Sequence, residues 1–372
     1  MDPQTIFCHN PACPASGQVG KGNIGVHSLK ERRYICHVCG KTFAETKGTV
    51  FYRLRTAKDV VVLVVTLLAY GCPLQAIVIA FGLDERTVLS LQTKSGQQCQ
   101  RVHEHLVEQP RDLGQVQGDE IRAKMQGGIL WMAMAIQVQT RLWLGGVLST
   151  ARDMNLIVTL MQKVRHSALC RPLLFCVDGC AAYIRAIRRV FREPIRTGKR
   201  GCPRLRPWDG IHIAQVVKQY ANKHIVAVTR RIVQGTQAQI DALLQHTQGG
   251  GLINTAYIER LNATFRSRIT ALIRRGRALA RQTQTLHSAM YLVGTIYNFC
   301  AYHKSLRLPL YLPNHKRRWL RRTPAIAAGI TDHLWTVTEL LSFRVPPPPW
   351  RPPKRRGRPS NAIKSLVAQW CS

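Results

Sequence analysis

The chain has 372 residues, of which 54 are Lys or Arg and 19 are Asp or Glu, so its formal net charge at pH 7 is +35. A compact chain with so much charge of one sign repels itself, so we expect a polyanionic partner. Because the basic residues occur along the whole length, the composition favours nucleic acid over a membrane surface. The length allows two or three domains with a sizeable core.

Residues 1–48 hold two cysteine pairs, Cys8 with Cys13 and Cys36 with Cys39. Two such pairs across a β-hairpin give the tetrahedral thiolate coordination that suits structural Zn²⁺. His9 and His37 stand beside these cysteines and are alternative ligands. The first 15 residues are polar, so we expect no signal peptide and a cytoplasmic, nucleoid-associated protein rather than a disulfide scaffold.

Residues 49–112 are expected to form a helical DNA-binding domain. The pattern predicts helices over 57–70 and 74–81, a turn at Gly82, and a third helix that begins at Asp84 or Glu85 and carries Arg86 and Thr87. This order is typical of a helix-turn-helix, whose third element would contact DNA. A plain helical hairpin remains the alternative. Residues 60–83 carry no charge, but Gly71, Cys72 and Pro73 interrupt them, so we expect two buried helices and no membrane span.

A mixed α/β layer follows, with strands expected over 115–125, 129–138, 142–149 and 172–177 and helices over 155–164 and 181–191. Asp119 lies inside the first strand, where Asp is disfavoured. Asp178 ends the fourth strand, at the edge where open α/β sheets place their sites. An outward-facing Asp119 and a helix-capping Asp178 are the simpler alternatives. Residues 193–250 are less readable, with two possible strands, and we expect an insertion there.

Residues 249–268 combine three glycines with an amphipathic helix, for which Asn254 is a plausible N-cap. Glu259, Asn262 and Arg266 share its polar face. Glu259 heads a stretch from Arg260 to Thr331 that contains no acidic residue. A surface Glu paired with an Arg is the ordinary interpretation of such a residue. If Asp119, Asp178 and Glu259 lie together, they need a cation, and Mg²⁺ is the usual choice where phosphate is also a ligand.

Three segments together resemble the acidic triad of DDE transposases from bacterial insertion sequences. They are GlyAspGlu at 118–120, ValAspGly at 177–179 and AsnThrAlaTyrIleGluArgLeuAsnAlaThrPheArg at 254–266. The CysHisValCysGlyLysThrPhe segment is similar to the zinc ribbon that some members carry, and TyrAsnPhe with HisLysSerLeu at 297–306 is similar to their closing segment. The resemblance covers about residues 5–310, and the spacing from Asp178 to Glu259 is longer than in the most compact members.

The resemblance implies a ribonuclease-H-like catalytic core with a mixed five-stranded sheet over 113–305, preceded by a zinc ribbon and the helix-turn-helix. Asp119, Asp178 and Glu259 would hold two Mg²⁺ or Mn²⁺ ions for strand cleavage and strand transfer, and Asn262 and Arg266 would line the DNA side of the Glu259 helix. Glu120 would contribute much less. The partners would be transposon-end and target double-stranded DNA, bound by a homodimer or higher oligomer.

Residues 306–372 read as a basic tail in which the Pro-rich segment 346–360 is extended. Arg356, Gly357, Arg358 and Pro359 resemble an AT-hook, because an extended Arg-Gly-Arg fits the narrow minor groove of A·T-rich DNA. A tail that binds phosphate without preference is the alternative.

Two other classes of protein remain open on the sequence. A non-catalytic regulator would use the zinc ribbon, helix-turn-helix and AT-hook alone, but would leave the α/β region and its three carboxylates without a role. A tyrosine recombinase would use Tyr257 or Tyr297 as its nucleophile and needs no acidic triad, so its activity would survive EDTA.

Overall fold

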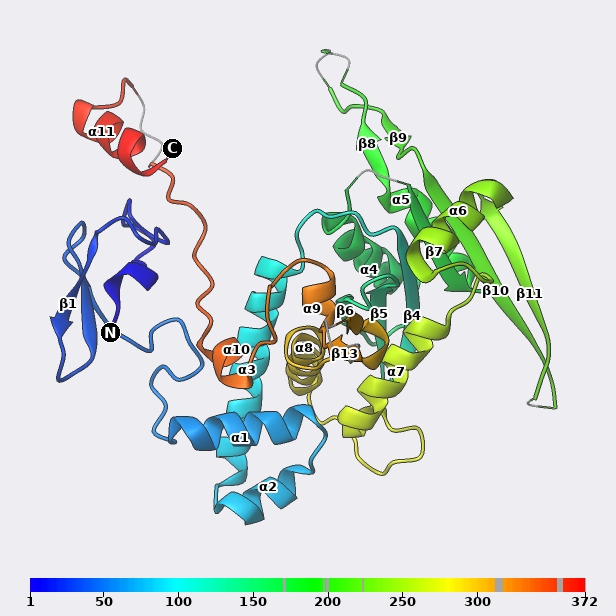
Figure 1. Cartoon of the computed structure of the whole chain (residues 1–372), viewed down its shortest axis with the longest axis horizontal. Helices are drawn as coiled ribbons and strands as arrows, with labels where there is room; N and C mark the ends of the chain where they lie inside the picture. The colour runs from blue at the N-terminus through cyan, green and yellow to red at the C-terminus, as the bar shows by residue number, and fades with distance from the viewer. Residues whose placement is uncertain are drawn as a thin grey trace. The chain divides into compact units, whose positions relative to one another are not determined.

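The computed structural model describes residues 1–169, 172–196, 198, 201–222, 224–311, 317–352 and 357–371. It divides the chain into two compact units. One unit combines residues 1–58 with residues 341–372, and the other contains residues 59–340. Figure 1 labels the elements of both units. In the described part of the chain, no helix is long and apolar enough to cross a membrane.

The first unit is built around a small antiparallel sheet of β1 (Ile24–Ser28), β2 (Arg33–Cys36) and β3 (Thr42–Ala44), preceded by the short helix η1 (Pro3–Thr5). Its core contains three of the four N-terminal cysteines together with Tyr34 and Phe43. The last helix of the chain, α11 (Asn361–Trp370), adds Trp370 to the same core.

Helix α11 is an addition to what the sequence analysis expects of the tail. No helix or strand forms in the described part of residues 346–360, in keeping with the expected extended segment. The chain then returns to the cysteine module, where the Gln18 amide donates a hydrogen bond to the carbonyl of Trp370 over 2.9 Å. The two ends of the chain therefore belong to one folded unit.

The second unit begins with three helices, α1 (Lys58–Ala69), α2 (Leu74–Phe81) and α3 (Glu85–Leu106). Gly82 ends α2 with a φ of 60°, in the left-handed region that favours glycine, and Asp84 caps α3 by accepting a hydrogen bond from the Arg86 amide. These boundaries agree closely with the helices expected from the sequence. The charge-free stretch is divided between α1 and α2.

Six strands form the main sheet in the order β11-β10-β7-β4-β5-β6. Their bounds are β4 (Gln115–Met125), β5 (Gly128–Gln137), β6 (Trp143–Ser149), β7 (Leu173–Asp178), β10 (Ile211–Ala221) and β11 (His224–Gln234). β4, β5 and β6 pair antiparallel, β7 pairs parallel with both β4 and β10, and β11 pairs antiparallel with β10.

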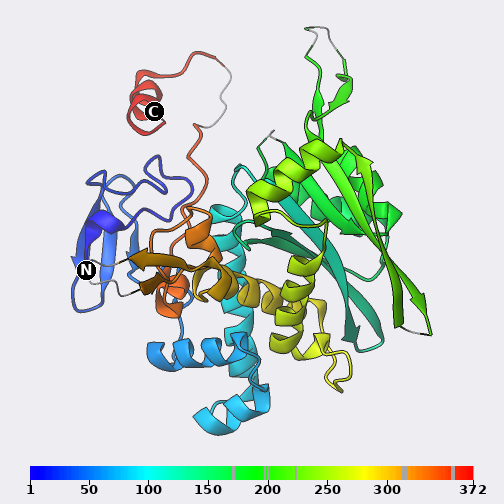
Figure 2. The same cartoon turned by 45° about the vertical axis from the view of Figure 1, so that its right-hand side comes forward.

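The expectation of five strands is corrected to six, because the stretch 193–250 contributes both β10 and β11 to this sheet. The first half of β10 is buried, so it continues the core of the sheet. The same stretch also supplies α6 (Gln237–Gln248) and part of a separate ribbon, β8 (Arg192–Pro194) with β9 (Leu205–Pro207), which Figure 2 shows extending away from the sheet.

Helices cover both faces of the sheet. α4 (Met154–His166) packs on β5 and β6 and contacts α5 (Ala181–Val190), whereas α6 packs on β4 and β7 and α7 (Ala256–Arg268) packs on β4 and β5. α8 (Thr283–Phe299) lies between α3 and the edge strand β6. The remaining elements are η2 (Thr270–Leu272), η3 (Lys304–Leu306), β12 (Leu308–Tyr311), β13 (Arg317–Leu320), α9 (Pro324–Ala327) and α10 (Val337–Ser342).

The contact between α8 and β6 centres on Trp143, which is fully buried. The Asn298 side chain accepts a hydrogen bond from the Trp143 amide and donates one to its carbonyl, both over 2.9 Å. Asn298 therefore satisfies backbone groups on the outer side of the edge strand β6, where no further strand pairs within the described residues. A Cβ atom on Gly294 would lie 2.2 Å from the Trp143 ring, so only glycine fits there without a shift.

Candidate metal centre

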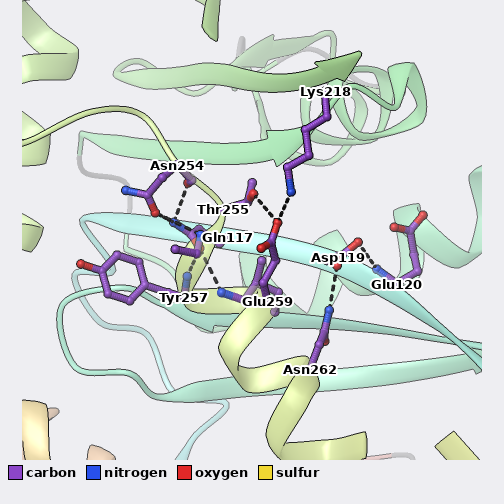
Figure 3. Close-up of polar contacts among 11 residues, drawn as sticks. Gln117, Asp119, Glu120, Lys218, Asn254, Thr255, Tyr257, Glu259 and Asn262 are labelled. Carbon is purple, nitrogen blue, oxygen red and sulfur yellow. Dashed lines mark hydrogen bonds and ion pairs between the residues drawn. The ribbon is translucent and has the colours of Figure 1, made fainter. Parts of the chain in front are cut away.

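The candidate site is organised by one strand, β4, and by the start of α7. The Gln117 side chain on β4 accepts hydrogen bonds from the amides of Tyr257 and Ile258, over 3.1 and 3.0 Å. These are two of the first N–H groups of α7, which have no partner within the helix. Asn254 contributes as well, because its side-chain oxygen accepts from the Ala256 amide over 3.1 Å. Figure 3 shows these contacts beside the acidic side chains.

Asp119 lies two residues after Gln117 and therefore projects from the same face of β4. One of its oxygens accepts from the Glu120 amide over 2.8 Å, and the other accepts from the side-chain amide of Asn262 on α7 over 2.7 Å. Gln117 and Asp119 thus attach the same helix at two points. This fixes the position of α7 relative to β4 (Figure 3).

The pKa of Asp119 is raised from its ordinary value of 3.8 to about 6, chiefly by burial and also by the neighbouring Glu120, Asp178 and Glu259, while the hydrogen bond from the Glu120 amide opposes the change. The three neighbouring carboxylates repel the charged form of Asp119. A bound cation would remove that repulsion.

Asp178 ends β7, next to β4. In the parallel pairing of these strands, Val177 lies opposite Gly118, so Asp178 and Asp119 follow at adjacent positions. The Asp178 side chain accepts from the Cys180 amide over 3.0 Å, which orders the turn into α5. Asp178 therefore has the expected position at a strand end, whereas the N-cap of α5 is Cys180, so Asp178 is not the helix cap that the alternative proposes.

Glu259 lies in the first turn of α7, where the helix dipole favours a negative charge. It accepts a hydrogen bond from the Thr255 hydroxyl over 3.1 Å and forms an ion pair with Lys218 of β10. Asp119, Asp178 and Glu259 line one cavity of about 410 Å³, together with Arg152 and Lys218. Three acids from three separate segments therefore face one space that also contains two cations.

The tightest acidic group is not the expected triad. Within the described residues, Asp119, Glu120 and Asp178 each offer an oxygen within 4.8 Å of the others, and Glu259 is not part of that group. Glu120 is also not a peripheral residue, because its side chain is fully buried and pairs with Arg152 over 3.1 Å. The group could hold a metal ion, since carboxylate oxygens are the ligands that hard divalent cations prefer.

The residues predicted to contact DNA differ in exposure. Asn262 is fully buried and its amide is committed to Asp119, so it orients the acid instead of facing solvent. Arg266 is half-buried, and burial lowers its pKa, with Arg274 acting in the same direction. At the start of α3, Arg86 is exposed and Thr87 is half-buried.

Four cysteine sulfurs form a second candidate metal site. The Sγ atoms of Cys8, Cys13, Cys36 and Cys39 lie within 4.8 Å of one another. Burial raises the pKa of Cys13 to about 12 and also raises the pKa of Cys8, a cost that binding of a metal cation to the thiolates would offset. The set could therefore bind a metal ion.

The two histidines beside the cysteines are placed differently from ligands. His9 packs between the rings of Phe7 and Phe43, and burial lowers its pKa to about 4. A Cβ on Gly25 would lie 2.4 Å from the His37 ring. Neither histidine belongs to the four-sulfur group in the described part of the chain.

Several other predicted residues can now be placed. In the AT-hook-like segment, Gly357, Arg358 and Pro359 are exposed, and Arg356 lies outside the described residues. Tyr297 is buried, which raises its pKa, and the Arg141 guanidinium lies 3.9 Å from the centre of the Tyr257 ring.

The sequence analysis misses Gln117, Arg152 and Lys218. Strand alternation could have indicated Gln117, because it shares a face with Asp119. Arg152 lies between β6 and α4, and Lys218 becomes a neighbour of Glu259 only through the pairing of β10, so no local pattern marks either one.

Comparison with known proteins adds no assignment: no family model and no curated protein matches this sequence.

Proposed function

We propose that this chain is a DDE-class transposase that binds transposon-end DNA and catalyses metal-dependent strand cleavage and strand transfer into target DNA. The observation that carries the proposal is the arrangement of Asp119, Asp178 and Glu259 around one cavity. The three acids come from β4, the end of β7 and the start of α7, as the sequence resemblance implies. They lie in a chain whose net charge of +35 favours a polyanionic substrate.

The strand order supports a ribonuclease-H-like core. Three antiparallel strands, β4 to β6, lead through α4 to the parallel strand β7 and through α5 to the parallel strand β10. Such a sheet brings the first and fourth strands together at its centre, which is where Asp119 and Asp178 lie. In this proposal β11 and the β8–β9 ribbon are additions to the core.

The donor set fits divalent metal ions. Asp119 and Asp178 lie close together and line one cavity with Glu259, and a cation there would offset the burial and the nearby carboxylates that raise the pKa of Asp119. Asp119, Asp178 and Glu259 would hold Mg²⁺ or Mn²⁺. Two such ions, when bound, would activate a water or a 3′-hydroxyl and stabilise the leaving oxygen of an in-line phosphoryl displacement.

The protein side chains prepare this site in three ways. Gln117 and Asn262 hold α7 on β4, so the carboxylates of Asp119 and Glu259 keep a defined separation. Lys218 neutralises Glu259 in the state described here, and Glu259 would leave this ion pair to become a ligand. The N-terminus of α7 places the positive end of the helix dipole beside Glu259.

The other parts of the chain would bind DNA. Cys8, Cys13, Cys36 and Cys39 would hold a structural Zn²⁺, and the exposed Arg86 at the start of α3 would contact the duplex as in a helix-turn-helix. Gly357, Arg358 and Pro359 would contribute to binding in the A·T minor groove. Strand transfer joins two DNA segments, so we propose a homodimer or higher oligomer on DNA.

The test uses a plasmid that carries the genomic DNA flanking the reading frame, incubated with the purified protein. Mg²⁺-dependent nicking at the flanks and joining to a second plasmid are expected, and both should disappear with EDTA or in Asp178→Asn. The exposed Asp241→Asn variant is the matched control and should cut normally. Cutting that survives EDTA would favour a tyrosine recombinase, and binding to the flanks without cutting under any of these conditions would favour a regulator.

A further inference from the structure

Arg152 occupies a distinctive position beside the three acids. It follows β6 and immediately precedes Asp153, the N-cap of α4, whose side chain accepts from the Leu156 amide over 3.0 Å. The backbone at this junction is therefore fixed, and the Arg152 side chain lines the same cavity as Asp119, Asp178 and Glu259.

Three contacts hold the guanidinium of Arg152. Its Nε donates to Glu120 over 3.1 Å, its Nη2 lies 3.8 Å from an oxygen of Asp178, and its Cζ lies 5.1 Å from the centre of the Trp131 ring. Stacking on an aromatic ring and a fork of N–H donors are the features by which Arg binds planar or tetrahedral oxyanions. The side chain nevertheless remains 44% exposed, while that of Glu120 is 0% exposed.

The difference in exposure between Arg152 and Glu120 argues against an ion pair that serves only the stability of the fold. Burying Glu120 is costly, and one of its oxygens, Oε2, is buried and has no hydrogen-bond partner among the described residues. An arrangement that served only the core could replace both residues by apolar side chains at little cost. Glu120 instead holds one edge of the Arg152 guanidinium, and the rest of that guanidinium faces the cavity.

We propose that Arg152 binds a non-bridging oxygen of the DNA phosphodiester beside the carboxylates, and that Glu120 is the positioning residue that aims it. This proposal rests on the proposed function, since it gives the metal site its substrate contact. The ligand class is a phosphodiester anion, because a guanidinium fork matches phosphate oxygens and its charge offsets that of the substrate. When Asp178 engages a metal ion, Nη2 of Arg152 becomes available to the phosphate.

The test uses the dinucleotide TpT, which contains one phosphodiester, because binding of long DNA to so basic a protein would mask the loss of one contact. Mn²⁺ binding is first measured from the relaxation of water protons. The enhancement of ³¹P relaxation in TpT by the bound Mn²⁺ then reports whether the phosphate lies beside the metal. Arg152→Ala should keep Mn²⁺ binding and weaken TpT binding roughly tenfold.

The variants separate the roles of the two residues. Arg152→Lys should restore only part of the affinity for TpT, because it keeps the charge without the fork. Glu120→Gln should keep Mn²⁺ binding and weaken TpT binding, whereas loss of Mn²⁺ binding would show that Glu120 is a metal ligand and would overturn its positioning role. Arg196→Ala, an exposed change two residues after the end of β8, controls for the loss of one positive charge.

The outcomes distinguish this inference from the proposed function. If the wild-type protein binds no Mn²⁺, or Asp178→Asn binds it equally well, the metal site itself is wrong. If Mn²⁺ binds as expected but Arg152→Ala leaves the ³¹P relaxation of TpT unchanged, the phosphate role of Arg152 is wrong and the metal site stands.

Discussion

Replacing Asp119 by Asn should stabilise the metal-free protein at neutral pH but not in acid. The folded protein raises the pKa of this buried carboxyl from 3.8 to about 6, so the folded state binds a proton more tightly than the unfolded state does. A group of this kind lowers the free energy of unfolding as the pH rises from about 4 to about 6, and the whole penalty is present above that range. The introduced amide cannot ionise, so the Asp119→Asn variant does not carry this penalty.

The size of the effect follows from the two pKa values. The gap between 3.8 and about 6 corresponds to about 3 kcal/mol at pH 7.5, and to about 1 kcal/mol at pH 4.5, where the unfolded carboxyl is partly protonated. The amide offers one acceptor where the carboxylate offers two, at a cost of about 1 kcal/mol at either pH. The net gain should therefore be about 2 kcal/mol at pH 7.5 and close to zero at pH 4.5.

The structure explains why an amide should be accommodated in the Asp119→Asn variant. The oxygen of the introduced amide can keep the hydrogen bond from the Glu120 backbone N–H. Its NH₂ group can donate to the side-chain oxygen of Asn262 once the Asn262 amide has rotated, because in the described part of the chain that oxygen is buried and accepts no hydrogen bond.

Thermal denaturation of the wild type and the variant in EDTA at the two pH values measures the difference, with Asp241→Asn as the exposed control. The melting temperature of Asp119→Asn should exceed that of the wild type by about 5 °C at pH 7.5. Mg²⁺ should then raise the melting temperature of the wild type and leave the variant unchanged. A variant that is destabilised equally at both pH values would refute the reasoning.

Three further predictions concern other parts of the chain. Cys36→Ser should lower the zinc content from about one ion per chain and unfold the cysteine module, while the second unit keeps its melting transition. Full zinc content in purified Cys36→Ser would reject Cys36 as a zinc ligand. Gly294→Ala should lower the free energy of unfolding by about 3 kcal/mol in urea titrations, because its Cβ would lie 2.2 Å from Trp143. The control Gly128→Ala has open space around its Cβ and should change that free energy by much less, and equal effects would contradict the packing argument. Arg358→Ala should lower the slope of log affinity against log salt by about one on an A·T-rich duplex, and an unchanged slope would count against the minor-groove role. This substitution is a cleaner test than deleting the tail, because the tail includes the buried Trp370.

The secondary structure near the site could largely be predicted from the sequence because its signals are local. The turn at Gly82 and the N-cap at Asp84 mark α2 and α3, and β4 has the expected bounds. Apolar runs and the short turn between β5 and β6 identify β4 to β6. These patterns involve neighbours in sequence, so they can be read without the tertiary structure.

The sixth strand and the final helix could not be predicted in the same way. β11 is exposed along most of its length, so it lacks the buried stripe that marks a strand, and its place in the sheet depends on pairing with β10. α11 follows a Pro-rich basic segment, and only its docking of Trp370 on the cysteine module explains why it forms. Both elements are determined by contacts distant in sequence.

In the candidate site, too, local sequence features could be predicted and contacts between distant residues could not. The unusual settings of Asp119, Asp178 and Glu259 are visible in sequence, because an acid inside a strand, at a strand end or alone in a basic region is out of place. Their partners are not visible, since Asn262 and Lys218 meet these acids only after β4, β10 and α7 are assembled. The sequence pattern also treats Asn262 as a surface residue, whereas helix packing buries it against β4.

Glu259→Gln tests the central claim most directly, because it keeps the shape of the side chain and removes one negative charge from the three acids that line the cavity. We expect this variant to bind the flanking DNA at least as well as the wild type, since the protein becomes more positive, and to lose Mg²⁺-dependent nicking and strand transfer by orders of magnitude. The measurement is a single gel assay that follows binding, nicking and joining of the same labelled flank. Cutting and joining at near wild-type rate would contradict the assignment of Asp119, Asp178 and Glu259 as one catalytic metal site.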